Sequence, residues 1–220
     1  MTKRGHAYHH GDLRRTLVGA ALRIVEQSGA GALSLRELAR KAGVSHAAPY
    51  RHFASREALL AALATEGFLG LSAEMQACAG AERDPLRRLR ALGLAYVRHA
   101  VAHPGHFKVM FSRDLDANAQ APELQAAAEP TLRSLVACIA DGQSAGLIRH
   151  GDPRRLAVPA WSVVHGLSML LIDRQLAPLL DGKIDVDAEA HAAIDVIALG
   201  LRPAPAKKRR RARRPVGDVS

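Results

Sequence analysis

Aromatic residues are scarce in this chain, where Phe, Trp and Tyr together make up 4% of 220 residues. Alanine and leucine are abundant instead, and both favour helix. No stretch alternates apolar and polar residues for long enough to indicate a β-strand. The sequence therefore predicts an all-α protein. Its hydrophobic content of 48% is enough for a sizeable core, in one large or two small domains.

Cysteines are also few, and the two present, Cys78 and Cys138, lie far apart with no partner spacing. This argues against a disulfide framework and favours a reducing compartment. The N-terminus lacks the apolar run of a signal peptide, so we expect a cytoplasmic protein. The most apolar stretch, residues 156–172, includes polar residues and a proline and is slightly short for a membrane span. We expect a buried helix there, and no membrane partner.

Sequence motifs of catalysis are missing as well. The chain has no GxSxG motif, phosphate-binding loop, glycine-rich dinucleotide turn or CxxC pair. His99 and His103 are four residues apart with His106 nearby, a spacing that can hold a metal ion. No carboxylate or cysteine completes the set in the sequence, and surface or capped histidines are the simpler interpretation. We therefore expect no enzyme: no catalytic residues, no metal site and no cofactor.

Positive charge is plentiful but unevenly placed. The net charge is +10, of which residues 1–53 carry +6, residues 54–206 carry −2 and residues 207–220 carry +6. Both ends are basic and the middle is slightly acidic. This asymmetry indicates a polyanionic partner for the ends of the chain.

Residues 34–53, SLRELARKAGVSHAAPYRHF, predict a helix-turn-helix. Ser34 and Glu37 have the spacing of a capping box, in which each side chain bonds the other residue's backbone amide. Gly43 stands where a left-handed residue ends a helix, because it has no Cβ to clash. Ser45 can cap the next helix. An apolar stripe at helical spacing completes the first helix: Leu35, Leu38, Ala39 and Ala42.

The second helix of this pair, ending near Phe53, is too polar for a core helix. Such a helix can lie in the major groove of DNA. Tyr50 and Arg51 can donate to phosphates, while Ser45 and His46 can reach base edges from the helix start. The alternative is a solvated surface helix in an ordinary bundle.

The remaining chain reads as successive helices with short breaks. Ser55 can cap a helix that runs to about Cys78. Asp84 and Asp152, each followed by proline, can start two more. We expect a weak helix from Pro122 that Pro130 interrupts, and a last helix capped by Asp187. We divide the chain into a flexible basic arm (1–11), a helix-turn-helix domain (12–54), a helical ligand-binding and dimerisation domain (55–201) and a disordered basic tail (202–220).

The stretch ALSLRELARKAGVSHAAPYRHFASREALL resembles the DNA-binding motif of TetR-family transcriptional regulators. The remainder resembles a subgroup named for a Trp-His-Gly (WHG) motif, through Trp161, His165 and Gly166 in WSVVHG and through HPGHFKVMF at 103–111. Together the two resemblances cover most of residues 12–201. They imply an all-helical homodimer that binds operator DNA, represses transcription and releases DNA when a small molecule enters a cavity.

The family pattern also implies roles for single residues. Base-facing or groove-facing positions fall on Ser34, Ser45, His46, Ala47 and Arg51, and phosphate-contacting positions on Tyr50, His52 and Arg56. The departure is Ala47, Ala48 and Pro49. The two alanines can contact a thymine methyl but form no bidentate hydrogen bonds. Pro49 requires a helix that is very short or tightened, since it lacks a backbone amide.

Candidates to line the effector cavity are adaptable apolar or aromatic side chains in the larger domain. They are Met75, Phe107, Met110, Trp161, His165 and Met169. For each of them, ordinary core packing is the alternative.

Two other functions stay open. The tail at 207–214 can make the protein a general polyanion or membrane-surface binder. Within the family, the chain can also be an activator or act without a ligand.

Overall fold

The computed structural model describes residues 10–115 and 122–204, and the regular elements in these ranges are all helical. The predicted all-α class is thereby confirmed. Most of the predicted arm and the predicted tail from residue 205 lie outside the described residues. The α-helices are α1 (His10–Ser28), α2 (Leu35–Ala42), α3 (Arg56–Ala79), α4 (Pro85–Ala102), α5 (Pro104–Met110), α6 (Pro122–Ser144), α7 (Pro153–Ile172) and α8 (Val186–Gly200); two 3-10 turns are η1 (Ala30–Ala32) and η2 (Pro49–Arg51).

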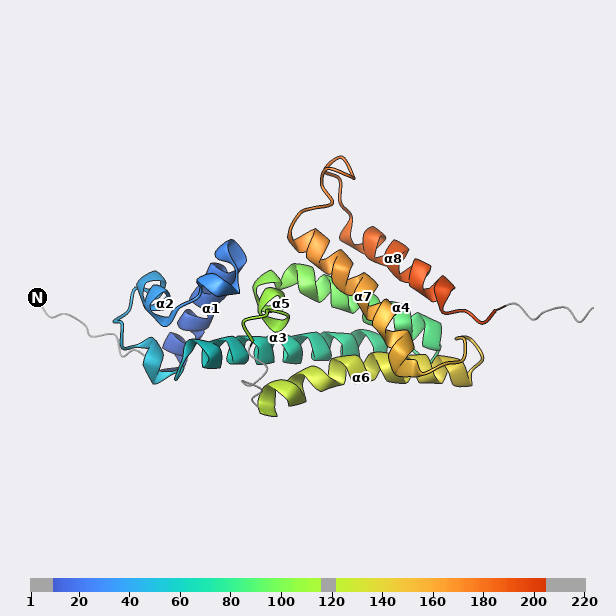
Figure 1. The fold of residues 1–220 in the computed structure, drawn as a ribbon, viewed down its shortest axis with the longest axis horizontal. Helices are drawn as coiled ribbons and strands as arrows, with labels where there is room; N and C mark the ends of the chain where they lie inside the picture. The colour runs from blue at the N-terminus through green and yellow to red at the C-terminus, as the bar shows by residue number, and fades with distance from the viewer. Residues whose placement is uncertain (1–9, 116–121, 205–220) are drawn as a thin grey trace, which may run out of the picture.

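The helices form a small N-terminal group and a larger body, which α3 joins (Figure 1). α1 and α2 lie beside the start of α3, and α3 continues along the length of the body. In the body, α3 packs against α4, α5 and α6, while α7 packs against α4, α6 and α8. α5 also contacts α1, so the two parts meet at a second place. A movement of α3 or α5 would therefore be felt in both parts.

Three predicted helix starts are confirmed by their capping hydrogen bonds. The Ser55 hydroxyl accepts the amide of Ala58 at 3.2 Å, and the Asp84 carboxylate accepts the amide of Arg87 at 2.8 Å. The Asp152 carboxylate accepts the amide of Arg154 at 2.9 Å. These bonds satisfy amides that have no partner inside the helix, which is why short local sequence patterns suffice to predict them.

The predicted interruption at Pro130 is wrong, because α6 continues through it. A proline inside a helix removes one amide and crowds the carbonyl four residues earlier. Here α6 buries residues on both sides of the proline, Ala127 before it and Cys138 and Ile139 after it. Packing along α3 and α4 thus holds the two halves in one helix despite the local cost.

The predicted cap of the last helix is wrong by two residues. Asp185 caps α8, and its carboxylate accepts the amides of Asp187 and Ala188 at 3.0 and 3.2 Å. Asp187 is occupied elsewhere, since its carboxylate accepts from the Arg98 guanidinium of α4 at 2.8 Å. The ion pair lowers the pKa of Asp187.

The apolar stretch 156–172 forms α7, but only one face of this helix is buried. Leu156, Ala160 and Val164 are buried, whereas Val158 and Leu170 are exposed. The expected helix is present, but it is buried on one side only. α3 and α7 are both long and apolar enough to cross a membrane by composition alone, with 50% and 28% of their apolar windows buried within the chain. The exposed face of α7 is thus an apolar surface that packing within this chain does not explain.

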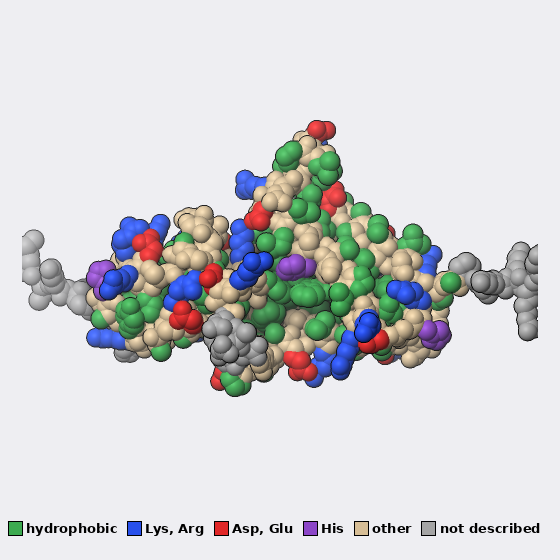
Figure 2. Space-filling view, viewed as in Figure 1, with side chains coloured by type: hydrophobic (Ala, Val, Ile, Leu, Met, Phe, Trp, Pro, Cys, Tyr) green, Lys and Arg blue, Asp and Glu red, His purple; other side chains and the backbone are tan. Residues whose placement is uncertain are grey.

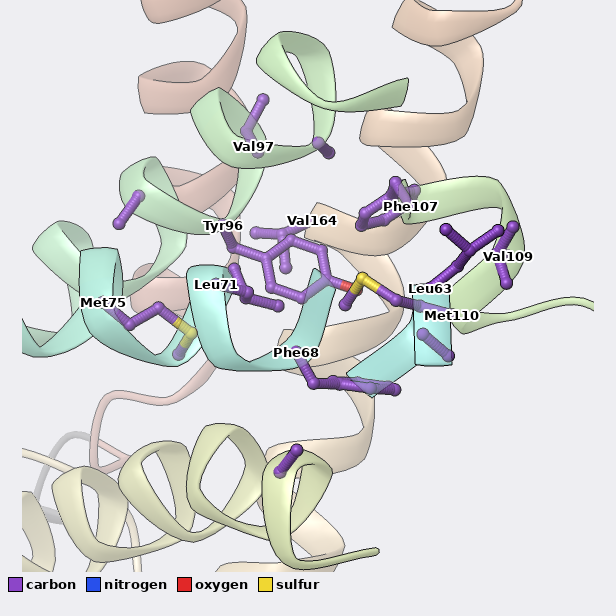
Figure 3. Close-up of a cluster of buried hydrophobic side chains, with 14 of the residues drawn as sticks. Leu63, Phe68, Leu71, Met75, Tyr96, Val97, Phe107, Val109, Met110 and Val164 are labelled. Carbon is purple, nitrogen blue, oxygen red and sulfur yellow. The ribbon is translucent and has the colours of Figure 1, made fainter. Parts of the chain in front are cut away.

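A continuous hydrophobic core runs from the N-terminal helices into the body. Its centre is drawn in Figure 3, where α3 contributes Leu63, Phe68, Leu71 and Met75. The ring of Tyr96 reaches these residues from α4. The same helix thus supports the N-terminal group with its first turns and forms the wall of the body with its later ones.

Candidate DNA-binding surface and ligand cavity

The first helix of the predicted helix-turn-helix is α2, and its ends are as expected. The Ser34 hydroxyl accepts the amide of Glu37 at 3.1 Å. Gly43 has φ 67° and ψ 32°, the left-handed conformation that ends the helix. The Glu37 carboxylate does not complete the capping box, because it accepts from the Arg40 guanidinium at 2.6 and 2.8 Å. Both ends of α2 are nevertheless fixed.

The second segment is shorter and tighter than an α-helix, as the proline in it predicts. The chain turns at residues 46–48, and the 3-10 turn η2 follows. The amide of Ala48 donates to the Ser45 carbonyl, and the amide of Arg51 donates to the Ala48 carbonyl. These are bonds of the i to i+3 kind, which a segment with no amide at Pro49 can still form.

Side chains of this segment divide cleanly between a buried and an exposed face. Pro49 and Phe53 are buried and anchor the segment, and the Arg14 guanidinium lies 5.8 Å from the centre of the Phe53 ring. Ala48 and His52 are half-buried. The exposed side chains of the segment are Ser45, His46, Ala47, Tyr50 and Arg51, and Ser34 is exposed as well. Figure 2 shows several Lys and Arg side chains on the surface of the N-terminal helices.

Arg56, an expected phosphate contact, is held by groups of the protein itself. Its guanidinium donates to the carbonyls of Leu33 and Ala30 at 2.8 and 2.9 Å and lies 3.3 Å from the Asp114 carboxylate. Only 25% of the side chain is exposed. Arg56 therefore joins the start of α3 to the loop before α2 and to the segment after α5, and its expected phosphate contact stays a prediction.

Two basic residues of α2 were not among the predicted site residues. Arg36 and Lys41 are both exposed on α2, which contacts η2. Their place in the sequence carried the signal, since both lie off the apolar stripe of a helix whose other face is buried. They add positive charge beside the exposed segment.

The body encloses a cavity of about 400 Å³, in the range of small-molecule sites. Its wall is mostly apolar and comes from five helices, α3, α4, α6, α7 and α8. Few lining residues are polar, namely Tyr96, Gln125, Glu129, Thr131 and Trp161. Apolar wall residues include Phe68, Met75, Leu92, Phe111, Leu132, Val164 and Ile194.

A hydrogen-bonded chain of three side chains stands at the cavity wall. The Trp161 indole donates to the Tyr96 hydroxyl at 3.0 Å, and that hydroxyl lies 2.9 Å from Nδ1 of His165. Burial raises the pKa of Tyr96 and lowers the pKa of His165, so both are neutral near pH 7. Because the indole can only donate, the tyrosine proton is available to Nδ1 of the neutral imidazole. Tyr96 is thereby fixed in place.

Only two of the six residues that were predicted to line the cavity do so. Met75 and Trp161 line the cavity, whereas Phe107, Met110, His165 and Met169 do not. Phe107 and Met110 are buried in the core, and Met169 packs against that core half-buried. His165 lies behind the wall. Its ring is 4.6 Å from that of Phe111, and its Nδ1 lies within hydrogen-bond distance of the Tyr96 hydroxyl.

Tyr96, Phe68 and Phe111 line the cavity but were not predicted to do so. Tyr96 had a detectable signal, because a tyrosine on the apolar face of a helix needs a hydrogen-bond partner for its hydroxyl. Its partners come from α7, and no local pattern in the sequence places them beside it.

Comparison with known families and structures bears on both regions. A family model described as "Bacterial regulatory proteins, tetR family" matches residues 17–63, and one described as "Tetracyclin repressor-like, C-terminal domain" matches residues 89–197. The first covers the helix-turn-helix and the start of α3, and the second covers most of the cavity wall.

This chain is also similar to individual proteins and structures. The HTH-type transcriptional regulator BetI of Rhizobium meliloti (strain 1021) is 38% identical over 79 residues, which span 36% of this chain and 39% of that relative. A structure of a protein with unknown function from Rhodococcus sp. RHA1 is 39% identical and has a TM-score of 0.72, over 90% of this chain and 99% of that chain.

The same fold occurs in a structure of AibR in complex with isovaleryl coenzyme A and operator DNA, at a TM-score of 0.70 and 18% identity, over 84% of this chain and 97% of that chain. With the matching family models and the helix-turn-helix geometry, these likenesses lead to one conclusion: the chain belongs to the TetR family of bacterial transcriptional regulators, with a helix-turn-helix DNA-binding domain.

Proposed function

We propose that this protein is a homodimeric repressor that binds operator DNA through residues 34–52 and releases it when an apolar molecule fills the cavity. One observation carries this proposal. α3 begins directly after the exposed segment, and its later residues Phe68 and Met75 line the cavity. A ligand that shifts α3 therefore changes the position of the DNA-binding segment.

The exposed segment supplies the DNA contacts in this proposal. Ser34, Ser45, His46, Ala47, Ala48 and Arg51 face the bases or the groove, and Tyr50 and His52 contact phosphates. The two buried anchors support this orientation, since Pro49 and Phe53 hold the backbone while the polar side chains stay in solvent. Ser45 and His46 lie at the start of the segment, where side chains of a recognition element reach base edges.

The dimer in this proposal forms through α7 and α8. The outer faces of these helices carry large apolar side chains that the chain itself leaves exposed, among them Val158, Val196 and Leu199 at 58%, 69% and 66%. Two copies that pack these faces together would bury this surface in a four-helix arrangement. Two recognition segments would then sit at a fixed spacing, as paired half-sites on DNA require.

The effector in this proposal is an apolar small molecule with one hydrogen-bonding group. The cavity wall is mostly hydrocarbon surface, its polar lining residues are Tyr96, Gln125, Glu129, Thr131 and Trp161, and no Lys or Arg is among its described lining residues. A thioester acyl group, such as that of the isovaleryl coenzyme A bound to AibR, fits the wall chemically, with its charged part outside the cavity. Trp161 and His165 hold Tyr96, which gives the WHG motif a physical role and supports placing the chain in that subgroup.

The domain boundaries follow from the same proposal. Residues 12–54 form the DNA-binding part and residues 55–201 form the cavity and the dimer interface, and the protein acts in the cytoplasm where its DNA is found. Arg56 marks the boundary, because it bonds carbonyls of the first part and faces Asp114 of the second.

The test measures the affinity of the full chain for a duplex that carries its preferred site, with and without isovaleryl and longer acyl coenzyme A thioesters. We expect at least one thioester to weaken DNA binding about 5-fold to 150-fold, the usual range of allosteric coupling. Free coenzyme A is the control for the charged part alone. Equal affinities with every thioester at a concentration that saturates the protein would remove the ligand-released mechanism while leaving DNA binding intact.

A further inference from the structure

A carboxylate and two imidazoles meet where α3 faces α4. Glu74 lies on α3, His99 lies on α4, and His103 follows the last residue of α4 at the junction with α5. One potential ligand atom from each of the three lies within 4.8 Å of the other two. The cluster is separate from the cavity wall, since none of its members lines the cavity.

His99 is buried without the hydrogen bonds that a buried imidazole normally makes. Its side chain is 4% exposed, and within the described part of the chain neither ring nitrogen makes a hydrogen bond of good geometry. Nδ1 lies 3.0 Å from Oε1 of Glu74 but out of line for a hydrogen bond. An unsatisfied polar group in the interior is costly, so its presence calls for a physical reason. A cation bound by the nitrogen lone pair supplies one.

Room for this imidazole is made by a glycine on the facing helix. A Cβ on Gly70 would lie 3.1 Å from Cε1 of His99. Gly70 is one turn before Glu74 on α3, so the same face of α3 both admits the ring and presents the carboxylate.

The two distances from the carboxylate are close to those between ligands that share one ion. Oε1 of Glu74 lies 3.0 Å from Nδ1 of His99 and 3.6 Å from Nε2 of His103. Nitrogen and oxygen ligands at about 2.1 Å from a tetrahedral Zn²⁺ lie about 3.4 Å from one another. Glu74 and His103 are 44% and 46% exposed, which leaves a path for an ion and room for a water as the fourth ligand.

We propose that Glu74, His99 and His103 bind one Zn²⁺ or a similar first-row divalent ion. Two imidazoles with one carboxylate form a borderline donor set that suits such ions better than Mg²⁺ or Ca²⁺. The bound ion joins α3 to α4 and stabilises the folded chain. This site is independent of the proposed effector cavity and of operator binding.

The experiment uses the untagged full chain after removal of metal with a chelator, and titrates it with Zn²⁺ alone by calorimetry. We expect one Zn²⁺ per chain and a rise in Tm with Zn²⁺, because the ion binds the folded state. Glu74→Gln and His103→Ala should each weaken Zn²⁺ binding more than about 100-fold, since loss of an outer-shell partner alone costs up to that much. Both side chains are half-exposed, so both variants should fold.

Matched controls are Glu123→Gln and His150→Ala, which change exposed residues elsewhere and should bind Zn²⁺ like the parent. His6, His9 and His10 are a second source of imidazoles near the N-terminus, so their triple alanine variant is also tested. The proposal predicts that this variant keeps the one-to-one binding. Three results would overturn the proposal. They are that the parent fails to bind one Zn²⁺ per chain, that the triple alanine variant loses that binding, or that both Glu74→Gln and His103→Ala retain it.

Discussion

The DNA-binding segment and the cavity differ in how far apart along the chain their parts lie. The segment is built from residues 34–53, within one turn-linked pair of elements. The cavity wall collects side chains from α3 to α8, more than 120 positions apart at the extremes, as Phe68 and Ile197 illustrate. The first region follows from local rules of capping and turn geometry, whereas the second depends on how long helices pack.

The DNA-binding segment and the cavity also differ in how many of the few aromatic residues they contain. Phe68, Tyr96, Phe111 and Trp161 line the cavity, and Phe107 stands behind it with its ring 5.6 Å from that of Tyr96. The DNA-binding segment has Tyr50 exposed and Phe53 buried. Scarce aromatic surface is thus concentrated where an apolar ligand can use it, which leads us to expect substitutions that affect one region and spare the other.

The largest expected effect comes from the dimer, because it supplies both half-sites at once. The double variant Val196→Glu with Leu199→Glu should be a monomer and bind the preferred DNA site at least ~100-fold more weakly, since avidity of two linked modules reaches that size. Sedimentation and DNA titration measure the two quantities. Leu69→Glu is the control, because Leu69 is 57% exposed on α3 and should leave the dimer intact. A dimer that survives in the double variant would place the interface elsewhere.

Next in size is the loss of one base-reading side chain. Arg51→Ala should weaken specific DNA binding by about 10-fold to 100-fold, the value of one good base contact, and leave ligand affinity unchanged. Titration of the preferred duplex checks this, with Arg83→Ala as the control because Arg83 is exposed beyond the far end of α3. Unchanged DNA affinity in Arg51→Ala would show that the exposed segment is not the reading element.

Arg56→Ala should act on the junction of the two regions. It removes the donor of two backbone carbonyls and the partner of Asp114, so the free energy of unfolding should fall by about 2 kcal/mol. Urea unfolding measures it, and Arg36→Ala on the exposed face of α2 is the matched control. A variant that unfolds like the parent yet binds DNA more weakly would restore Arg56 to the phosphate contact that the sequence pattern implied.

The smallest expected effect is on the cavity wall. Tyr96→Phe removes the hydroxyl that accepts from Trp161 and lies against His165, and should cost about 1 kcal/mol of stability. It should change the affinity for acyl thioesters and spare DNA affinity without ligand. Thermal unfolding and ligand titration check both parts, with Phe68→Leu as a control that alters the wall without a hydrogen bond. Equal ligand affinity in Tyr96→Phe would exclude the hydroxyl from recognition.

Much of the fold was predictable from the sequence because the determining interactions are local. Ser55, Asp84 and Asp152 cap their helices as expected, and Gly43 and Pro49 shape the turn and the tightened segment. Where a partner lies far along the chain, local rules were misleading. Asp187 is taken by Arg98 of α4, which leaves the cap to Asp185.

The candidate sites show the same division. The exposure of Tyr50 and Arg51 follows from the polarity of the segment. The orientation of the Arg56 side chain instead depends on backbone carbonyls more than 20 residues away in the sequence. The triad of Tyr96 with Trp161 and His165 likewise joins α4 to α7. Glu74 of α3 lies beside His99 and His103, and no spacing in the sequence reveals this proximity.

Selection of bound duplexes from a random pool tests the central claim most directly. We predict a two-fold symmetric site whose half-sites lie about 34–36 Å apart, or a multiple of that distance, because two matching segments contact successive turns of the duplex. A chain truncated after residue 204 should select the same site. Two results would contradict specific binding by the helix-turn-helix. One is that the protein binds all duplexes of the pool equally well, and the other is that its sequence preference is lost when residues 205–220 are removed.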